Sequence, residues 1–331
     1  MRATRIPPLF MEGLSVRKYI LKRLLTVIPV MFIVSLMIFM LIHLTPGDPA
    51  RVMLGEQATQ EDVAALRESM GLDDPLPIQY FRWIGSLFKG DLGESIFMQD
   101  PMSKILADHI GPTLQLTAYS MLFSVLLAIP LGVIAAKKRG TMADHAISTL
   151  AMSGISIPSF LLGLFLILFI GVRLDLLPVA GYKAIEKYGF AKHFQYMILP
   201  SVALGLMGAG LLIRMTRSSV LDVLQSDYVK MARSKGVKEF FIIMKHALKN
   251  ALLPILTSVV QTLMGLLSGA AVVETMFNIP GMGQLIVNSV TRRDYETIQI
   301  IVLMMAVVNV LACLMVDILY GFIDPRVKLG K

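Results

Sequence analysis

Long apolar runs, separated by polar stretches, set the pattern of this chain. The first run covers residues 24–44, which is long enough to cross about 30 Å of hydrocarbon at the helical rise of about 1.5 Å per residue. Five more runs follow, at residues 113–136, 146–172, 195–213, 251–273 and 298–322. The pattern predicts an all-α polytopic membrane protein with six transmembrane helices.

The first run differs from a secretory signal peptide in two respects. Its apolar core is longer than that of a signal peptide, and no small-residue cleavage site is evident. We therefore expect an uncleaved first transmembrane helix, preceded by an N-terminal segment of residues 1–23.

The composition agrees with a membrane protein. Apolar residues make up 55% of the 331 positions and charged residues only 16%, against about 25% in soluble domains. A net charge of +8 would indicate nucleic-acid binding in a soluble protein, but here the basic residues gather in particular loops, so no nucleic acid is expected as a partner. The five histidines lack ligand-like pairing and Cys313 is the single cysteine, so we expect neither a metal site nor an intrachain disulfide.

The distribution of Lys and Arg predicts the orientation in the membrane. Six spans place both termini on the same side. About two thirds of the 31 Lys and Arg residues lie in the termini, at residues 137–139 and between residues 214 and 249. Since short loops rich in Lys and Arg stay in the cytosol, we expect cytosolic termini, including a tail of residues 323–331, and a cytosolic loop of residues 218–250. The expected location is the cytoplasmic membrane, in contact with its lipid.

A polar insertion of residues 45–112 separates the first two runs. Thr59 and Asp62 have the spacing of a capping box, and Gly71 is suited to end the helix that they begin. After two prolines, residues 78–88 predict an amphipathic helix that carries the only tryptophan, Trp83. We expect a small extracytoplasmic cap, which serves either as a spacer on the membrane surface or in substrate handling.

The stretch of residues 227–254 predicts two helices joined by a sharp turn. Tyr228, Met231 and Ala232 follow at i, i+3 and i+4, so they share one face of the first helix. The side chain of Ser226 or Asp227 is expected to cap the start of that helix.

Gly236 stands where a left-handed helix stop favours a residue without a Cβ atom. A second helix is expected from about residue 238 to residue 250, running into the membrane at Leu252. The loop then has the form of a docking knob on the cytosolic face. The alternative is an interfacial amphipathic helix with no partner.

Two of the predicted spans contain residues that favour bending or close approach. Pro158 should kink the third span because it removes a backbone donor from the helix. In the fourth span, Gly205, Gly208 and Gly210 should allow a neighbouring helix to come close.

Small residues recur at helical spacing in the fifth span. They are Ser258, Thr262, Gly265 and Gly269, and Gln261 and Ser268 flank them. Such a stripe serves either helix packing or the lining of a translocation path. Both interpretations hold if the path lies at a subunit interface.

Two acidic residues lie in or beside the last spans. Asp317 lies near the cytosolic end of the sixth span, where it can reach the membrane interface or pair with Arg326, and this structural role is favoured over a functional one. Glu274 lies at the outer end of the fifth span, before Pro280 and Gly281, which suit a tight turn.

The sequence lacks the common signatures of catalysis. No phosphate-binding Gly-x-x-x-x-Gly-Lys-[Ser/Thr] loop occurs, and no Ser/His/Asp arrangement or zinc-protease helix lies on any span. We expect a transport subunit with no catalytic residue and no cofactor of its own. If ATP drives transport, ATP and Mg²⁺ bind to a separate ATPase subunit. An ion-coupled secondary transporter is the alternative from another class, but it would need ionisable residues at mid-membrane, where only the off-centre Asp317 comes near.

Several motifs, in the same order, resemble those of the dipeptide/oligopeptide (peptide/nickel-type) permeases of ABC importers, in their first-permease subfamily. The loop carries Asp-Tyr-Val at 227–229, Ala-Arg-Ser-Lys-Gly at 232–236 and His-Ala-Leu-Lys-Asn-Ala-Leu-Leu-Pro at 246–254, and it resembles the cytosolic coupling loop of that family. The insertion carries Pro-Gly-Asp-Pro-Ala at 46–50 and Gly-Asp-Leu-Gly at 90–93. The glutamate that names this Glu-Ala-Ala loop is missing here, as is usual in peptide-type members.

The resemblance implies a type I ABC importer permease fold, with a five-helix core at residues 113–322. It also implies a homologous second permease subunit, two ATPase subunits and an extracytoplasmic substrate-binding protein. The import of di- or oligopeptides is the expected function. The same machinery imports oligosaccharides, nickel or glutathione in some family members, so these cargoes stay open.

We assign two groups of residues to this mechanism as hypotheses. The ATPase-coupling loop comprises Asp227, Tyr228, Met231, Ala232, Arg233, Lys235, Gly236 and His246. The path or gate comprises Pro158, Gln261, Thr262, Gly265, Glu274, Pro280 and Gly281.

Overall fold

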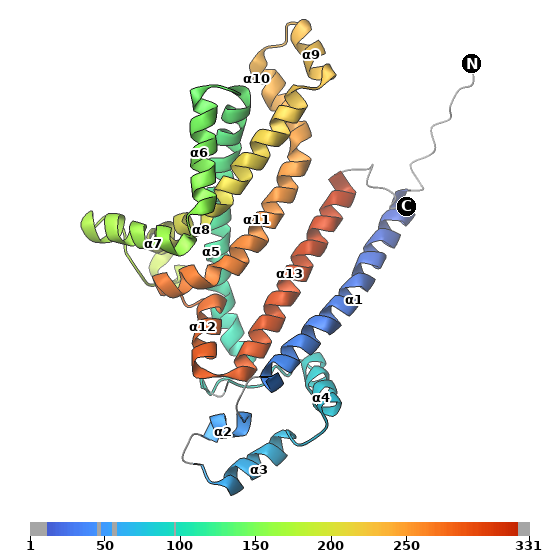
Figure 1. The fold of residues 1–331 in the computed structure, drawn as a ribbon, viewed down its shortest axis with the longest axis vertical. Helices are drawn as coiled ribbons and strands as arrows, with labels where there is room; N and C mark the ends of the chain where they lie inside the picture. The colour runs from blue at the N-terminus through green and yellow to red at the C-terminus, as the bar shows by residue number, and fades with distance from the viewer. Residues whose placement is uncertain (1–11, 45–47, 55–57, 96, 324–331) are drawn as a thin grey trace. The chain divides into compact units, whose positions relative to one another are not determined.

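The computed structural model describes residues 12–44, 48–54, 58–95 and 97–323, which form helices joined by loops (Figure 1). Within these ranges no β-strand is present, only an isolated bridge between Glu94 and Pro101. The chain divides into two compact units, residues 1–46 with 302–331 and residues 47–301. The all-α fold expected from the apolar pattern is therefore confirmed.

The first unit contains helix α1 (Glu12–Leu44) and the part of helix α13 (Tyr295–Ile323) that follows residue 301. α1 holds the apolar stretch Leu25–Met40, where the first span was predicted. The side chain of Asp317 and residue Arg326 lie outside the described parts of the chain, so their pairing stays a prediction.

Three short helices form the insertion: α2 (Pro49–Leu54), α3 (Gln60–Met70) and α4 (Leu76–Phe88). The predicted capping box of α3 is confirmed. The N–H of Asp62 donates to Thr59 Oγ1 (3.2 Å), and the N–H of Thr59 donates to the Asp62 carboxylate (3.2 Å). Gly71 ends α3 in the left-handed conformation at φ +66°, also as predicted.

The rest of the second unit consists mainly of long helices. In chain order they are α5 (Met102–Lys137), α6 (Met142–Ser156), α7 (Ser159–Leu166) with the π-helical segment η2 (Ile167–Arg173), α8 (Ile185–Leu224), α9 (Asp227–Ser234), α10 (Glu239–Phe241) with the π-helical segment η3 (Ile242–Ala247), α11 (Leu248–Phe277) and α12 (Met282–Arg292).

Four helices in the described parts of the chain are long and apolar enough to cross a membrane. They are Met102–Lys137, Ile185–Leu224, Glu239–Phe277 and Tyr295–Leu314. The pair Met142–Ser156 and Ser159–Arg173 is a fifth candidate. These five correspond to the last five predicted spans, and the shorter apolar stretch of α1 corresponds to the first.

The helices extend beyond the apolar runs that predicted them. α5 already begins at Met102, so its first turns come from the stretch assigned to the insertion. Pro112 lies buried inside α5 and does not end the helix, although the apolar run starts just after it. A helix can continue beyond the apolar run because its backbone hydrogen bonds do not depend on an apolar sequence.

The third predicted span is broken rather than kinked. α6 ends at Ser156, α7 begins at Ser159, and the two segments bend by 101°. Ile157 before the proline has extended backbone angles (φ −83°, ψ 119°), because a proline ring disfavours the helical region for the preceding residue. The bend predicted at Pro158 is confirmed, and it is sharper than a kink.

Helix α8 packs against three neighbours through small residues. A Cβ atom at Gly205 would lie 2.6 Å from the carbonyl oxygen of Ser120 on α5, and one at Gly208 would lie 2.7 Å from Thr262 on α11. A Cβ at Gly210 would overlap the carbonyl oxygen of Ala151 on α6. Each glycine therefore permits close approach to a different helix, which confirms the predicted packing and extends it.

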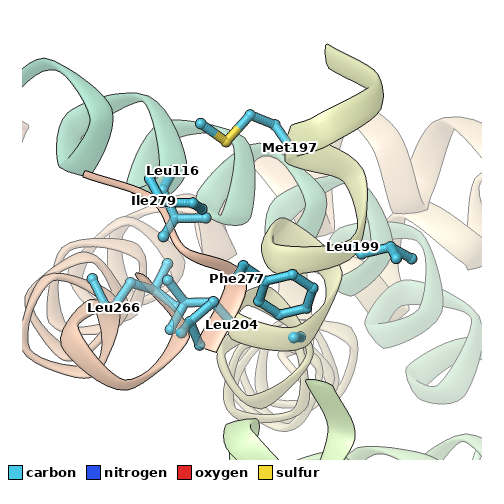
Figure 2. Close-up of a cluster of buried hydrophobic side chains, with 10 residues drawn as sticks. Leu116, Met197, Leu199, Leu204, Leu266, Phe277 and Ile279 are labelled. Atoms are coloured by element: carbon cyan, nitrogen blue, oxygen red, sulfur yellow. The ribbon is translucent and has the colours of Figure 1, made fainter. Parts of the chain in front are cut away.

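An apolar cluster joins α5, α8 and α11 near the end of α11 (Figure 2). Leu116 of α5, Leu204 of α8 and Phe277 of α11 are almost completely buried there. Ile279, just beyond α11, is fully buried in the same cluster. The turn after α11 is thus part of the core.

A buried carboxylate organises the corner between α11 and α12. Glu274 is fully buried, and its Oε2 accepts hydrogen bonds from the backbone N–H groups of Gly283 (2.8 Å) and Gln284 (3.0 Å) at the start of α12. Its Oε1 accepts a hydrogen bond from Thr113 Oγ1 of α5 (2.6 Å). Thr113 Oγ1 in turn accepts the N–H of Met282 (2.8 Å). Glu274 therefore caps α12 and links three helices.

A second carboxylate joins the start of α6 to the last turns of α8. The buried Asp144 accepts two hydrogen bonds from the Arg217 guanidinium, from Nε (2.6 Å) and from Nη2 (2.8 Å). It also accepts the backbone N–H of Gly140 (2.9 Å). This two-pronged ion pair was not predicted, since Arg217 counted only as a basic loop residue in the sequence.

Replacing Glu274 with Gln should lower the free energy of unfolding by about 2 kcal/mol, because an amide NH₂ group would then face donors that the carboxylate now satisfies. The measurement is denaturant unfolding of the purified protein in detergent. Glu186→Gln is the matched control, since Glu186 is exposed. An unfolding midpoint equal to that of the wild type would contradict the capping role of Glu274.

Replacing Asp144 with Asn should also destabilise the protein by about 2 kcal/mol, because it leaves a partly buried guanidinium without its carboxylate. The same unfolding assay, applied to Asp144→Asn, Arg217→Gln and the double variant, measures the coupling. The double variant should lose less free energy of unfolding than the two single variants lose in sum. Strict additivity would mean that the two side chains do not stabilise each other.

Candidate functional site: the α9 knob and the exposed face of α11

We use the name knob for α9, the turn at Gly236, and α10 with η3. In the second unit it lies at the opposite end from α12 (Figure 1). α9 follows α8 after a break of two residues, Gln225 and Ser226. The knob thus begins directly at the end of the most extensively packed helix.

The predicted side-chain cap of α9 is wrong. Ser226 has the extended backbone of an N-cap residue, but its hydroxyl donates to the carbonyl oxygen of Val223 instead of accepting an N–H of α9. The carboxylate of Asp227 binds Lys230 Nζ (2.9 Å). The Ser226 hydroxyl is used in this way because the carbonyl groups of the last turn of α8 lie within its reach, and that of Val223 also accepts the backbone N–H of Ser226 (3.1 Å). Lys230 lowers the pKa of the Asp227 carboxyl through this hydrogen bond.

Val229 anchors α9 to the rest of the unit. Its side chain is fully buried, in one cluster with Leu224 of α8 and with Ile242, Ile243 and Ala247 of η3. The sequence pattern did not single out Val229, because the spacing of Tyr228, Met231 and Ala232 defines another face of the helix. The available signal was a β-branched apolar residue between Tyr228 and Lys230.

The turn at Gly236 has the predicted left-handed conformation, at φ +75°. The N–H of Gly236 donates to the carbonyl oxygen of Arg233 (2.9 Å), and the N–H of Val237 donates to that of Ala232 (3.2 Å). These two bonds make up a Schellman motif, which requires a residue that tolerates positive φ. A second helix follows as predicted, and it continues without a break from Glu239 to Phe277.

Apolar side chains are exposed on the surface of the knob. Met231 of α9 is 60% exposed and Phe240 of α10 is 67% exposed, and Phe241 and Met244 are about half exposed. Met231 belongs to the predicted face of α9, while the contribution of α10 and η3 was not foreseen. Exposed apolar groups gathered in this way are typical of interaction sites.

The other residues assigned to the loop hold the knob together or surround its apolar surface. The Arg233 guanidinium forms two hydrogen bonds with the Glu239 carboxylate (2.7 and 3.2 Å) across the turn. Tyr228 is half exposed, and its hydroxyl oxygen accepts a hydrogen bond from Asn250 Nδ2 (2.9 Å). The carbonyl oxygen of His246 accepts a second hydrogen bond from the same amide. Lys235 is exposed, as are Lys238, Lys245 and Lys249.

The predicted small-residue stripe of α11 divides between two faces. Ser258 and Thr262 are buried, and Thr262 packs against Gly208 of α8. Gly265 is exposed and a Cβ there would meet nothing within 4 Å, so it takes no part in the packing against α8, and its assignment to a path stays a prediction. The stripe divides because the single helix α8 covers only one side of α11.

An exposed and partly polar face therefore runs along α11. Gln261, Gly265, Ser268 and Val272 follow at helical spacing and are all exposed. The other residues assigned to a path lie elsewhere. Glu274, Pro280 and Gly281 form the α11–α12 corner, and Pro158 lies at the break between α6 and α7. A Cβ at Gly281 would overlap the Glu274 carboxylate, so this position requires glycine.

The comparisons with known proteins agree with this architecture. The family described as "Binding-protein-dependent transport system inner membrane component" matches residues 128–329, and the N-terminal family of the same transport components matches residues 16–117. Among solved structures, an inward-facing form of the MetNI methionine ABC transporter matches with a TM-score of 0.57 at 19% sequence identity. That match covers 68% of this chain and 99% of the other chain, and it supports the fold.

Similar sequences extend over nearly the whole chain. The protein is 40% identical to the probable peptide ABC transporter permease protein y4tP of Sinorhizobium fredii, over 94% of this chain and 99% of that protein. It is 42% identical to the glutathione transport system permease protein GsiC of Salmonella paratyphi A, over 94% of this chain and 98% of that protein. The chain therefore belongs to the binding-protein-dependent transport system inner membrane components, the permease subunits of ABC importers.

Proposed function

We propose that this permease imports short peptides and that ATPase subunits drive it through the knob. The anchored knob, with its exposed apolar surface, is the observation that carries the proposal. In this arrangement the knob and both termini lie in the cytosol. The complex contains a homologous second permease, two ATPase subunits and an extracytoplasmic binding protein. ATP and Mg²⁺ bind to the ATPases, and this chain has no catalytic role.

The proposed cargo rests on the relatives. One is named for peptides and the other for glutathione, and each is at least 40% identical to this chain over nearly its whole length. Glutathione is itself a small peptide derivative, so short peptides are the class that both names share. The binding protein then selects among members of this class.

The chemistry of the knob indicates what its partner presents. Met231, Phe240 and Phe241 require an apolar socket, and the exposed lysines around them require acidic groups at its rim. Val229 packs α9 against α8 and η3, so a displacement of α9 moves both of these helices. Since η3 lies in the continuous helix Glu239–Phe277, a displacement reaches the Glu274 corner at its other end.

The exposed face of α11 is proposed to line the path together with the second permease. Gln261 and Ser268 offer polar groups on a helix that otherwise packs through its apolar sides. The exposed backbone at Gly265 lets a neighbouring helix or cargo come close. A path between two subunits explains why this face stays uncovered within a single chain.

Replacing Gly236 with Val should uncouple ATP hydrolysis from uptake while the complex still assembles. The variant has space for the side chain but must hold a β-branched residue at positive φ, which costs about 1–3 kcal/mol and turns α9 away from its position. The measurement is the number of ATP molecules hydrolysed per peptide imported in proteoliposomes.

Gly90→Val is the matched control for this variant. Gly90 ends α4 at φ +83° with a Schellman pair of the same form, and a Cβ there also meets nothing within 4 Å. The strain is therefore similar, but it falls far from the knob. The Gly90 variant should keep the wild-type ratio of ATP to peptide, and normal coupling in the Gly236 variant would refute the role of the turn.

A cysteine placed at Met231 should cross-link to the ATPase subunit in a background where Cys313, the single native cysteine, is replaced by Ser. A membrane-impermeant maleimide should label this cysteine only in inside-out vesicles. Glu186→Cys, exposed at the start of α8, is the control and should react only in right-side-out vesicles. The reverse labelling pattern would overturn the proposed orientation.

A further inference from the structure

A pocket of about 220 Å³ lies at the end of the second unit opposite the knob. Its walls come from the C-terminal half of α4, from residues 91–93 and from the first turns of α13. Trp83, Asp91, Glu296 and Gln299 contribute the aromatic and polar parts of the lining. Neither the knob nor the exposed face of α11 contributes to it.

The walls of the pocket are held in place by hydrogen bonds. The N–H of Asp91 donates to the carbonyl oxygen of Ser86 (3.0 Å), which ties residue 91 to the end of α4. Ser95 Oγ donates to the Asp294 carboxylate (2.7 Å), which also accepts the N–H of Thr297 (3.3 Å). Asp294 therefore caps α13 and ties Ser95 to the start of that helix, close to Glu296. The pocket is a built feature and does not depend on a free loop.

The polar lining has hydrogen-bonding capacity that the protein does not use. Gln299 is only 7% exposed, and its amide has no hydrogen-bond partner among the described residues. The amide atoms of Gln299 are not among the buried side-chain atoms that lack a partner, so they are accessible from the pocket and free to bond with a ligand there. Glu296 likewise forms no ion pair within the described parts of the chain, and a Cβ at Gly93 would lie 3.9 Å from its Oε2.

The charge around the pocket is negative. Asp91 and Glu296 line it, Asp294 lies directly behind it, and within the described ranges no Lys or Arg forms an ion pair with any of the three carboxylates. One oxygen of Asp91 accepts the N–H of Gly93 (3.0 Å), and the other remains available. The pocket thus combines two carboxylates, an amide oxygen and an indole ring.

We propose that this pocket binds a primary ammonium group. An ammonium ion has three N–H donors and no acceptor, which matches the Glu296 and Asp91 carboxylates and the amide oxygen of Gln299. The ring of Trp83 adds a surface that attracts cations. The volume is below the roughly 300–1,000 Å³ of ordinary ligand pockets, so it suits one charged chain end or side chain, and not a whole peptide.

Two sources could supply such a group: the amino terminus of a free peptide, or a lysine of a protein that docks on this surface. The ammonium site goes beyond the proposed function, and it is tested by binding, without transport. Failure of the site would therefore leave the transport proposal standing, and failure of the transport proposal would not remove the site.

Trp83 is the only tryptophan of the chain, so its fluorescence reports directly on the pocket. The full chain in lipid nanodiscs is titrated with n-butylammonium chloride and, in parallel, with uncharged 1-butanol. We expect a saturable change in Trp83 fluorescence with the ammonium compound and no such change with the alcohol. No saturable change, or an equal response to both compounds, would overturn the proposal.

Two variants test the lining. Glu296→Gln and Gln299→Leu should each weaken ammonium binding at least about tenfold, since a hydrogen bond to a charged group contributes more than a neutral one. Glu61→Gln is the matched control, because Glu61 is exposed on α3 and does not line the pocket. It should bind as the wild type does.

Asp91→Asn is a third variant, to be used if either of the first two fails to fold. It should also weaken ammonium binding. Wild-type affinity in the variants that do fold would overturn the assignment.

The source of the ammonium group is distinguished with three further probes. Binding of trialanine but not of N-acetyl-trialanine would assign the pocket to a peptide amino terminus. Binding of Nα-acetyl-lysine amide but not of trialanine would assign it to a lysine of a docking protein. If none of the three probes binds, the ammonium site is rejected.

Discussion

The close approach of α8 to its neighbours is the constraint on which the rest of this structure depends. Apolar side chains gain little by moving from lipid to protein, so helices in a membrane associate through tight van der Waals contact. Gly205, Gly208 and Gly210 provide this contact toward α5, α11 and α6. A Cβ atom at any of the three would push a neighbour away. Because α8 leads into α9 and packs along α11, this contact also positions both ends of the unit.

Each end of the unit is then completed by different chemistry. At the knob, Val229 lies in an apolar cluster that joins α8 to η3, and the Schellman turn at Gly236 returns the chain to the long helix Glu239–Phe277. At the other end, Glu274 collects the N–H groups that begin α12 and joins them to α5. One continuous helix therefore connects an exposed apolar surface with a fully hydrogen-bonded corner. Such a connection is what a permease needs if a separate motor is to move it.

The two ends also differ in charge. Exposed lysines surround the knob, whereas carboxylates line the pocket between α4 and the start of α13. A partner with acidic groups therefore suits the knob, whereas a positively charged partner or ligand suits the pocket.

Hydropathy and backbone preferences were enough to predict much of the local structure. The six apolar runs, the capping box at Thr59, the stop at Gly71, the break at Pro158 and the turn at Gly236 follow from hydropathy and backbone preferences, which depend only on neighbours in the chain. The surroundings of Glu274 and Gly265 could not be derived in this way, because each is hydrogen-bonded or left exposed according to which helix lies beside it. The side-chain cap predicted for α9 failed for a local reason, since the Ser226 hydroxyl donates to Val223 three residues earlier. The sequence by itself thus determined which segments form helices and which of these are apolar enough to cross a membrane. Only the tertiary structure decided which polar groups are satisfied and which face outward, because their partners lie up to 199 positions away along the chain.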